Sequence, residues 1–203
     1  MKQLIQFLIK KGCLKSLNII EAFAAVDRAD FVPVNLREKA YEDRPLRIGF
    51  GQTISQPAVV AFMLEQLDPH PEEIILDVGF GSGWQTVLLA RLVGERGKVV
   101  AVERISELYS FGRKNCEKYG YKNIEFVKGD ATAIDRGENY FDKIIVAASS
   151  KNKIPEIFKK QLKNKGKIVI PVRESIFVLT KENEKKFSEK EFPGFLFVPL
   201  IKD

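Results

Sequence analysis

The chain has 203 residues, of which 45% are apolar, and its 33 basic and 27 acidic side chains give a net charge of +6. That length and apolar content allow one ordinary domain with a buried core, which argues against intrinsic disorder. The single histidine, His70, lies between two prolines in an expected turn. We therefore expect no metal site and no Ser-His-Asp triad.

Cysteine usage and hydropathy bear on the compartment. Cys13 and Cys116 lie far apart and belong to no CxxC motif, which fits a reducing environment. No run approaches 18 apolar residues, and no small-residue cleavage site follows the N-terminal apolar stretch. The sequence thus predicts a cytoplasmic protein with no membrane partner.

The first seventy residues combine helices with a long loop. Apolar residues at helical spacing predict one helix around residues 4–9 and a second from about Leu17 to Val26. Residues 41–57 contain glycines and prolines without clear periodicity and are expected to form a long ordered loop. Loops of that length in compact domains are often functional.

From residue 72 onward, short apolar runs alternate with helical segments. The predicted strands are 74–78, 98–102, 124–127, 143–147 and 167–172, and the predicted helices are 84–93, 106–119 and 154–162. This alternation predicts a doubly wound α/β fold with a mostly parallel sheet. Residues 175–179 and 195–199 are predicted as extra strands joined by a charged turn over 181–191, and Pro171 is expected at a strand end or edge.

A glycine cluster follows the first predicted strand in the run Asp77-Val-Gly79-Phe-Gly81-Ser82-Gly83-Trp84. Glycines allow a sharp turn and a close approach of a ligand to the main chain, and the following helix start offers free N–H groups. Glu103, at the end of the second strand, is placed to accept hydrogen bonds from two ribose hydroxyls. The dinucleotide fingerprint would require glycine at position 84, so a nicotinamide cofactor is disfavoured.

The G-x-G-x-G pattern with a preceding acid resembles motif I of S-adenosylmethionine-dependent methyltransferases. The resemblance implies S-adenosyl-L-methionine as cofactor and S-adenosyl-L-homocysteine as product. It implies that Asp77 faces the cationic methionine end, directly or through water, and that Asp130 and Ala131 lie near the adenine. Simpler readings stay open: Asp77 as a buried helix-end cap, the glycines as a tight turn, Glu103 as a solvated acid, Asp130 as a turn residue and Trp84 as packing.

The upstream segment 40–57, with Tyr41-x-Asp43-x-Pro45 and Gly51-Gln-Thr-Ile-Ser55, closely resembles the signature loop of protein-L-isoaspartate O-methyltransferases. The resemblance extends through Phe31-Val-Pro33, Gly129-Asp130, 167–172 and 197–200 and covers nearly the whole chain. It implies a class I methyltransferase fold and methyl transfer to the free carboxylate of L-isoaspartyl residues in damaged proteins, which initiates repair. Such a carboxylate is ionised at pH 7, so the reaction needs positioning rather than a general base.

The same resemblance implies site residues. It makes Ser55 the catalytic residue, which we expect to orient the isoaspartyl carboxylate, and Asp43 and Val198 substrate contacts. The implied cofactor-binding residues are Gln52, Thr53, Ile54, Asp77, Gly79, Gly81, Ser82, Gly83, Glu103, Asp130 and Ala131. Two alternatives remain: Ser55 could cap the helix that follows it, and Asp43 could pair with Arg44 or Arg47 at the surface.

The chain departs from the family pattern around the site. A histidine common two or three residues after the motif serine is absent from Pro57-Ala-Val-Val60. Ala131 stands where a glycine is usual, Ser149 and Ser150 replace Ala-Pro, and Arg173 replaces a glycine. These departures allow altered activity or substrate preference.

The implied domain is the whole chain, 1–203. It comprises an N-terminal helical extension and substrate loop (1–71), a cofactor-binding core (72–172) and C-terminal strands (173–203). A methyltransferase acting on nucleic acid or a small metabolite is the alternative, because seven lysines fall between Lys151 and Lys167. Against it, no Pro-Pro-aromatic motif follows the fourth strand, and we expect no stable nucleic-acid partner. A third reading is a cofactor-binding module without catalysis.

Overall fold

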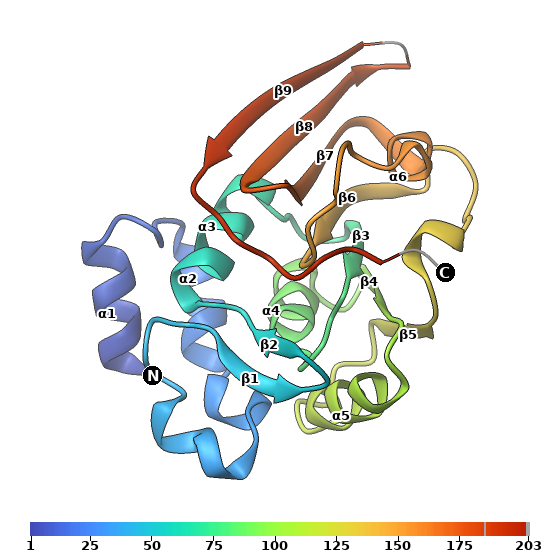
Figure 1. The fold of residues 1–203 in the computed structure, drawn as a ribbon. Helices are drawn as coiled ribbons and strands as arrows, with labels where there is room; N and C mark the ends of the chain where they lie inside the picture. Colours follow the sequence, from blue (N-terminus) through green and yellow to red (C-terminus); the bar gives the residue numbers. More distant parts are fainter. Residues whose placement is uncertain (185, 202–203) are drawn as a thin grey trace.

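The structure is a computed structural model that describes residues 1–184 and 186–201. A seven-stranded sheet forms the centre of the protein (Figure 1). Its strands are β3 (Ile74–Val78), β4 (Lys98–Glu103), β5 (Ile124–Lys128), β6 (Phe141–Val146), β7 (Leu162–Val172), β8 (Ser175–Asn183) and β9 (Lys186–Pro193). Their order in space is β5-β4-β3-β6-β7-β8-β9. The five strands from β5 to β7 are parallel, whereas β8 and β9 join antiparallel. This confirms the predicted mostly parallel α/β fold.

The topology places a ligand crevice. The chain leaves β3 toward one edge of the sheet through β4 and β5 and then returns to β6 on the other side of β3. In open α/β sheets, ligands bind outside the carboxyl ends of the strands at such a reversal. The segments that follow β3, β4 and β6 therefore face a common site.

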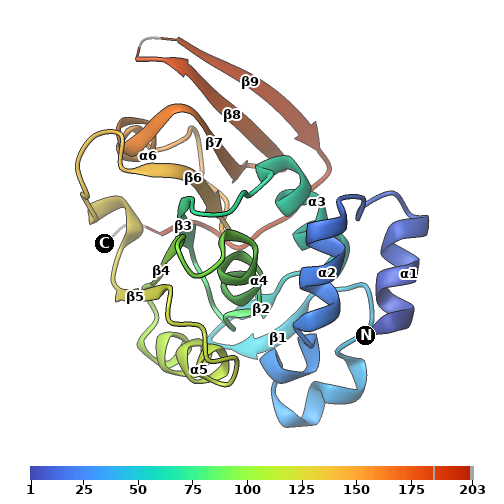
Figure 2. The same ribbon diagram turned by 180° about the vertical axis from the view of Figure 1, so that it is seen from behind.

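Alternating strand residues feed two apolar cores. Ile75, Ala101 and Ile145 face one core, and their neighbours Leu76 and Val102 face the other. The first core includes residues of α1 (Lys2–Lys10), α2 (Leu17–Ala25), α3 (Pro57–Leu67), α4 (Trp84–Val93) and α5 (Ser106–Glu117), and the second includes residues of α6 (Glu156–Gln161). Figure 2 shows α1, α2 and α3 gathered beside α4 on one side of the sheet. Both faces are thus covered, as buried parallel strands require.

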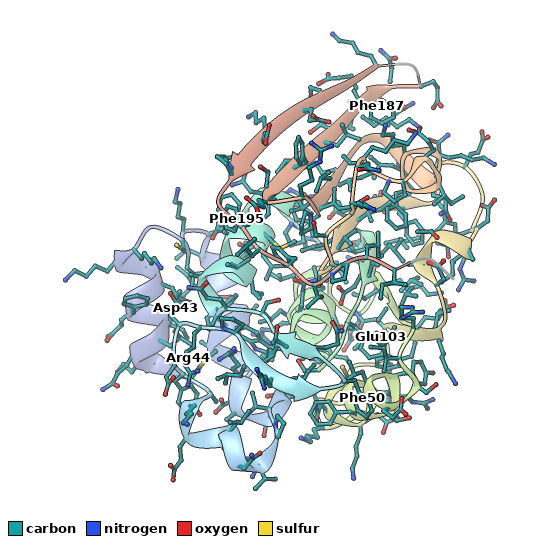
Figure 3. All side chains as sticks on the ribbon, viewed as in Figure 1. Asp43, Arg44, Phe50, Glu103, Phe187 and Phe195 are labelled. Atoms are coloured by element: carbon teal, nitrogen blue, oxygen red, sulfur yellow. The ribbon has the colours of Figure 1, made fainter. Side chains whose placement is uncertain are left out.

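The segment expected to be a loop at 41–57 contains regular structure. β1 (Leu46–Gly49) and β2 (Gln52–Ile54) form an antiparallel hairpin in which Leu46 pairs with Ile54. Phe50 lies at its tip, exposed and with φ of 53° (Figure 3). Two short 3-10 helices, η1 (Arg28–Phe31) and η2 (Val34–Lys39), connect this hairpin to α2.

The C-terminal prediction was wrong in two places. The charged segment predicted as a turn over 181–191 forms the end of β8 and most of β9, while Phe195–Pro199 is not a strand and makes one isolated bridge, Ser149 to Pro199. β9 is an edge strand with mostly exposed side chains, and charged residues on an edge oppose pairing with other chains. Figure 1 shows the β8–β9 hairpin projecting from the body.

The remaining sequence predictions were close. β7 begins at Leu162, five residues before the predicted start, so α6 is shorter than expected. Pro171 is the penultimate residue of β7, which confirms its expected place at a strand end. Among the described residues, no helix combines the length and apolar character needed to cross a membrane.

Candidate active site

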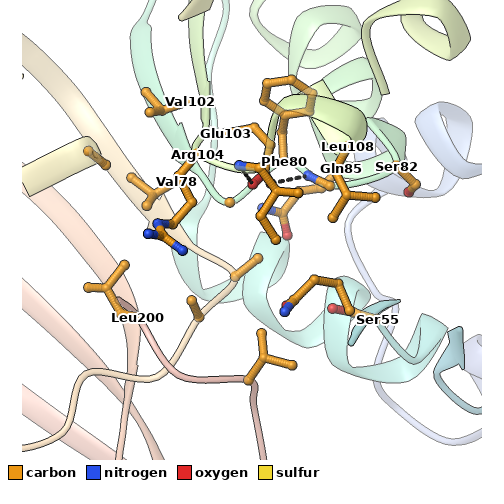
Figure 4. Close-up of a pocket in the computed structure, with 18 of the residues that line it drawn as sticks. Ser55, Val78, Phe80, Ser82, Gln85, Val102, Glu103, Arg104, Leu108 and Leu200 are labelled. Atoms are coloured by element: carbon orange, nitrogen blue, oxygen red, sulfur yellow. Dashed lines mark hydrogen bonds between the residues drawn. The ribbon is translucent and has the colours of Figure 1, made fainter. Parts of the chain in front are cut away.

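A pocket that is partly open to solvent lies at the carboxyl ends of β3 and β4 (Figure 4). The segment 52–55 that ends the hairpin and the C-terminal segment 198–201 form its other walls. It brings together most of the residues that the sequence singled out: Gln52, Thr53, Ile54, Ser55, Gly79, Gly81, Ser82, Glu103, Asp130, Ala131 and Val198. Asp43, Asp77 and Gly83 are not among its lining residues.

The glycine loop after β3 forms the pocket floor. Gly79 and Gly81 have φ of 77° and 51°, a region that side-chain-bearing residues seldom adopt. The Gly79 N–H donates to the carbonyl of Val102 at 2.8 Å, which fixes the loop to β4. A Cβ on Gly81 would lie 3.3 Å from Ile48 Cδ1, so the missing side chain keeps the main chain accessible.

Gly83 does not line the pocket and packs closely against α5. Its φ is 88°, and a Cβ there would collide with Cys116 Sγ and lie 2.8 Å from the Gly112 carbonyl oxygen. The absence of a side chain lets the start of α4 approach α5 closely. The sequence grouped Gly83 with the cofactor-binding residues, and that assignment stays a prediction.

Glu103 presents an oriented carboxylate. Its side chain is buried, with Oε2 accepting from the Gly81 N–H at 3.1 Å and Oε1 accepting from the Ile105 N–H at 2.9 Å. Each carboxylate oxygen can accept a further hydrogen bond. The arrangement suits two adjacent hydroxyls and excludes the reading of Glu103 as a solvated acid.

Asp77 lies behind the pocket wall. It is fully buried, with Oδ1 accepting from Gln85 Nε2 at 2.8 Å and Oδ2 accepting from Thr86 Oγ1 at 2.6 Å. Burial raises the pKa of this carboxyl to about 6, and the nearby charge of Glu103 adds to the effect. Gln85 lines the pocket, so an influence of Asp77 on a ligand would pass through that amide. This position is nearer to the helix-end reading than to direct contact.

Asp130 combines two predicted parts. Its Oδ1 accepts from the Thr132 N–H and its Oδ2 from Thr132 Oγ1, both at 2.8 Å, which caps the short 3-10 helix η3 (Ala131–Ala133). It also lines the pocket beside Ala131. The turn role and a place near a ligand are therefore compatible.

Ser55 lies on the pocket wall, and it does not cap α3. The residue before the helix is Gln56, and the Ala58 N–H is bound by Asp43 Oδ1 at 2.8 Å. The alternative in which Ser55 caps the helix was therefore wrong. The Ser55 hydroxyl is therefore not used in helix capping, and Ser55 lines the pocket.

Asp43 holds the loop onto the helix. Besides capping Ala58, its Oδ2 accepts from Gln56 Nε2 at 3.1 Å and pairs with Lys11 Nζ at 3.0 Å. Among the described residues, Asp43 forms its ion pair with Lys11 rather than with Arg44 or Arg47, and Arg44 pairs with Glu42. Substrate contact by Asp43 stays a prediction.

Several pocket residues escaped the sequence analysis. Ile105 and Leu108 follow Glu103 and give the pocket an apolar wall, and their helical spacing after the acid was a usable signal. Phe80 packs on Phe126 and Tyr109, with ring centroids 5.6 Å and 5.9 Å away. Arg104 and Ile201 also line the pocket, and no local pattern marked them. Leu200 lines it as well, within the segment 197–200 that the family resemblance covers.

The departures at 149–150 and 173 fasten the pocket rim. The Ser149 N–H donates to Val198 O at 2.7 Å, and its carbonyl accepts from the Leu200 N–H at 2.8 Å. Ser149 Oγ donates to the carbonyl of Arg173, whose φ is 54°. These bonds hold segment 198–200 across the strand ends. Ser150 Oγ donates to the carbonyl of Lys153 within its own turn.

Within the described residues, no group of three or more His, Cys, Asp or Glu side chains could hold a metal ion. The donor set instead suits a nucleoside with a charged tail: a carboxylate for hydroxyls, exposed main chain at Gly79 and Gly81, and apolar walls.

Comparisons with known proteins identify relatives over the whole chain. The family model described as protein-L-isoaspartate(D-aspartate) O-methyltransferase matches residues 1–203. A protein-L-isoaspartate O-methyltransferase from Methanopyrus kandleri is 40% identical over 205 residues, covering 98% of this chain and 90% of the relative. One from Aeropyrum pernix is 43% identical over 204 residues, covering 98% and 78%.

A solved structure gives the same fold. The crystal structure described as a protein-L-isoaspartate O-methyltransferase from Plasmodium falciparum, in complex with S-adenosyl-L-homocysteine, superposes with a TM-score of 0.88. It is 27% identical, and the match covers 100% of this chain and 98% of that one. The predicted class I methyltransferase architecture is thereby confirmed.

Proposed function

The chain belongs to the protein-L-isoaspartate O-methyltransferase family, and we propose that Ser55, the glycine loop and Glu103 form its reaction site. The protein is an S-adenosylmethionine-dependent enzyme that methylates isoaspartyl residues of proteins and so initiates their repair. The roles of individual residues are the proposal. The observation that carries it is that Ser55 shares one pocket with Gly79, Gly81 and Glu103, although some 50 positions separate Ser55 from Glu103.

The pocket residues fit the cofactor. Glu103 would accept from the two ribose hydroxyls, Asp130 and Ala131 would border the adenine, and Gly79, Gly81 and Ser82 would face the methionine end with Gln52, Thr53 and Ile54 opposite. When bound, S-adenosylmethionine supplies a methyl group activated by its sulfonium charge. Asp77 contributes a buried negative charge behind this wall through Gln85.

The protein's task is alignment. An isoaspartyl carboxylate is already ionised at pH 7, so no residue has to remove a proton from it. Ser55 Oγ would donate a hydrogen bond to one carboxylate oxygen and point the other at the methyl carbon, with Val198 packing against the substrate. Because opposite charges neutralise during transfer, the apolar wall of Ile105, Leu108 and Leu200 favours reaction by limiting water.

The test is label transfer from methyl-labelled S-adenosylmethionine to an isoaspartyl peptide, with the matching aspartyl peptide as control. We expect transfer to the isoaspartyl form alone. Ser55→Ala should lower turnover roughly 100-fold with an unchanged melting temperature, because Ser55 caps no helix. A variant with full turnover would remove Ser55 from the mechanism.

The alternative acceptors are weaker. Of the seven lysines between Lys151 and Lys167, four pair with acids: Lys159 with Glu156, Lys160 with Asp135 and Glu138, Lys163 with Asp142, and Lys167 with Asp68. Such local pairing reduces the field that would attract nucleic acid, and we propose no stable nucleic-acid partner. A strong, salt-sensitive affinity for RNA would contradict this.

We also propose that residues 1–203 act as one domain in the cytoplasm. The first apolar core draws on the helical extension, the central strands and β8 together, which supports one cooperative unit. Cys13 and Cys116 are free thiols, which supports a reducing compartment. One unfolding transition by both circular dichroism and Trp84 fluorescence would support the single unit.

A further inference from the structure

A buried arginine ties together the segment that carries Ser55. Arg28, the first residue of η1, has a fully buried side chain. Its Nη1 donates to the carbonyl of Ala40 at 2.6 Å, and its Nη2 donates to the carbonyls of Arg44 at 3.1 Å and Ser55 at 3.0 Å. Nη1 also lies 3.4 Å from the carbonyl of Glu42. One guanidinium thus binds both ends of the segment 40–55.

The bonds go to main-chain carbonyls, so they fix the path of the backbone. A planar guanidinium presents its donors in a rigid fork and can bind carbonyls on two sides at once. Burial lowers the pKa of Arg28 to about 10, and the charge of Asp43 opposes that effect. The side chain therefore stays charged at pH 7, and its hydrogen bonds are charge-assisted.

The neighbours of Ser55 have anchors of their own. Ile54 pairs with Leu46 across the hairpin, and Gln56 donates to Asp43. Arg28 Nη2 holds the carbonyl of Ser55 itself. That bond fixes the orientation of the peptide that joins Ser55 to Gln56.

Arg28 also contacts the cofactor side of the pocket. Its guanidinium carbon lies 5.4 Å from the centre of the Trp84 ring. Trp84 is the first residue of α4 and lines the pocket. The same side chain therefore touches the substrate segment and the helix that follows the glycine loop.

We propose that Arg28, which does not line the pocket, is a positioning residue for methyl transfer: it holds the Ser55 main chain at the correct distance from the glycine loop. This inference rests on the proposed role of Ser55 and extends it to a residue outside the site. A displacement of about 1 Å at a reacting group can lower a rate about 100-fold. Loss of the fork should therefore reduce turnover far more than cofactor affinity.

The experiment is a double-mutant cycle with Arg28→Lys, Ser55→Ala and the double variant, measuring kcat and KM for an isoaspartyl peptide. Lysine keeps the charge and lacks the fork. We expect each single variant to lose about 100-fold in kcat and the double variant to lose no more than that, because both act through one hydroxyl. The affinity for S-adenosyl-L-homocysteine should stay within about threefold by calorimetry. Arg37→Lys, an exposed arginine on η2, is the matched control and should retain full activity.

Melting temperatures with saturating S-adenosyl-L-homocysteine establish that each variant is folded at the assay temperature. If the lysine variant does not fold, Arg28→Gln takes its place, since its NH2 group keeps two N–H donors. Losses that multiply to about 10,000-fold in the double variant, or full turnover with lysine or glutamine at position 28, would overturn the inference. No transfer by the wild type would instead overturn the proposed function itself.

Discussion

Asp77→Asn should make the protein more stable at neutral pH. The carboxyl is fully buried, and no cation is among the causes that set its pKa. Raising that pKa from 3.8 to about 6 means that ionisation costs about 3 kcal/mol more in the folded protein than in the unfolded chain. The hydrogen bonds from Gln85 and Thr86 reduce this cost but do not cancel it.

The sign of the pH dependence follows from the protons bound. Below about pH 4 the carboxyl is protonated in both states and the substitution changes little. Between about pH 4 and 6 the folded protein keeps a proton that the unfolded chain has released, so wild-type stability falls as pH rises. Above about pH 6 the carboxyl is ionised in both states, and the wild type has lost the full amount of this stability. The asparagine variant avoids this loss, because its amide stays neutral and its Oδ1 can still accept from Gln85.

Urea unfolding at pH 4, 6 and 8 measures the effect. We expect the variant to exceed the wild type by up to about 3 kcal/mol at pH 8 and to match it at pH 4. Asp135→Asn, at an exposed aspartate, is the control and should show no such trend. We further expect the variant to bind S-adenosylmethionine more weakly, because it lacks the negative charge with which Asp77 of the wild type favours a cation in the pocket. A variant less stable than the wild type at pH 8, or one with the same difference at both extremes, would refute the reasoning.

Three further substitutions test the loop and the pocket. Asp43→Asn should lower the free energy of unfolding by about 1–2 kcal/mol in urea, because the charged cap of Ala58 is weakened; Glu42→Gln at the exposed neighbour should not. Glu103→Gln should weaken S-adenosyl-L-homocysteine binding about 10- to 100-fold by calorimetry, since its new NH2 must face the Gly81 or Ile105 N–H, and unchanged affinity would contradict the ribose assignment. Gly83→Ala should cost at least about 2 kcal/mol of stability through its collision with α5, whereas Gly120→Ala, with similar φ and open space, should cost about 1 kcal/mol.

The candidate site was largely predictable because its signals are local. A strand, three glycines and an acid at the next strand end lie within 30 residues, and sheet topology brings them to one edge. What could not be read locally was the detail of contact. Asp77 and Gly83 carry the same sequence signal as Gly79 and Gly81, yet only the packing against α4 and α5 places them behind the wall. Likewise, the capping of α3 by Asp43 joins residues 15 positions apart.

The C-terminal error has the same origin. Residues 181–191 are rich in charged side chains, a composition that is also typical of turns. An edge strand, however, pairs with only one neighbouring strand and can expose most of its side chains to water. Residues 195–199 are apolar, as the residues of a buried strand are. In the structure, however, this segment crosses the ends of the strands and forms its hydrogen bonds with the main chain of Ser149. Whether a segment forms a strand depends on a neighbouring strand with which it can pair, and the hydropathy of the segment does not show whether such a neighbour exists.

The sequence by itself determined the alternation of strands and helices, because hydrophobic periodicity acts over short distances. Its resemblance to known families, at the glycine cluster and at segment 40–57, implied the cofactor class and the family. Only the tertiary structure decided which groups stabilise the site. Arg28 has no distinguishing local pattern, and its importance arises because folding buries a guanidinium among carbonyls that lie 12 to 27 positions away. Such contacts depend on where distant segments meet, and that is set by packing of the whole chain.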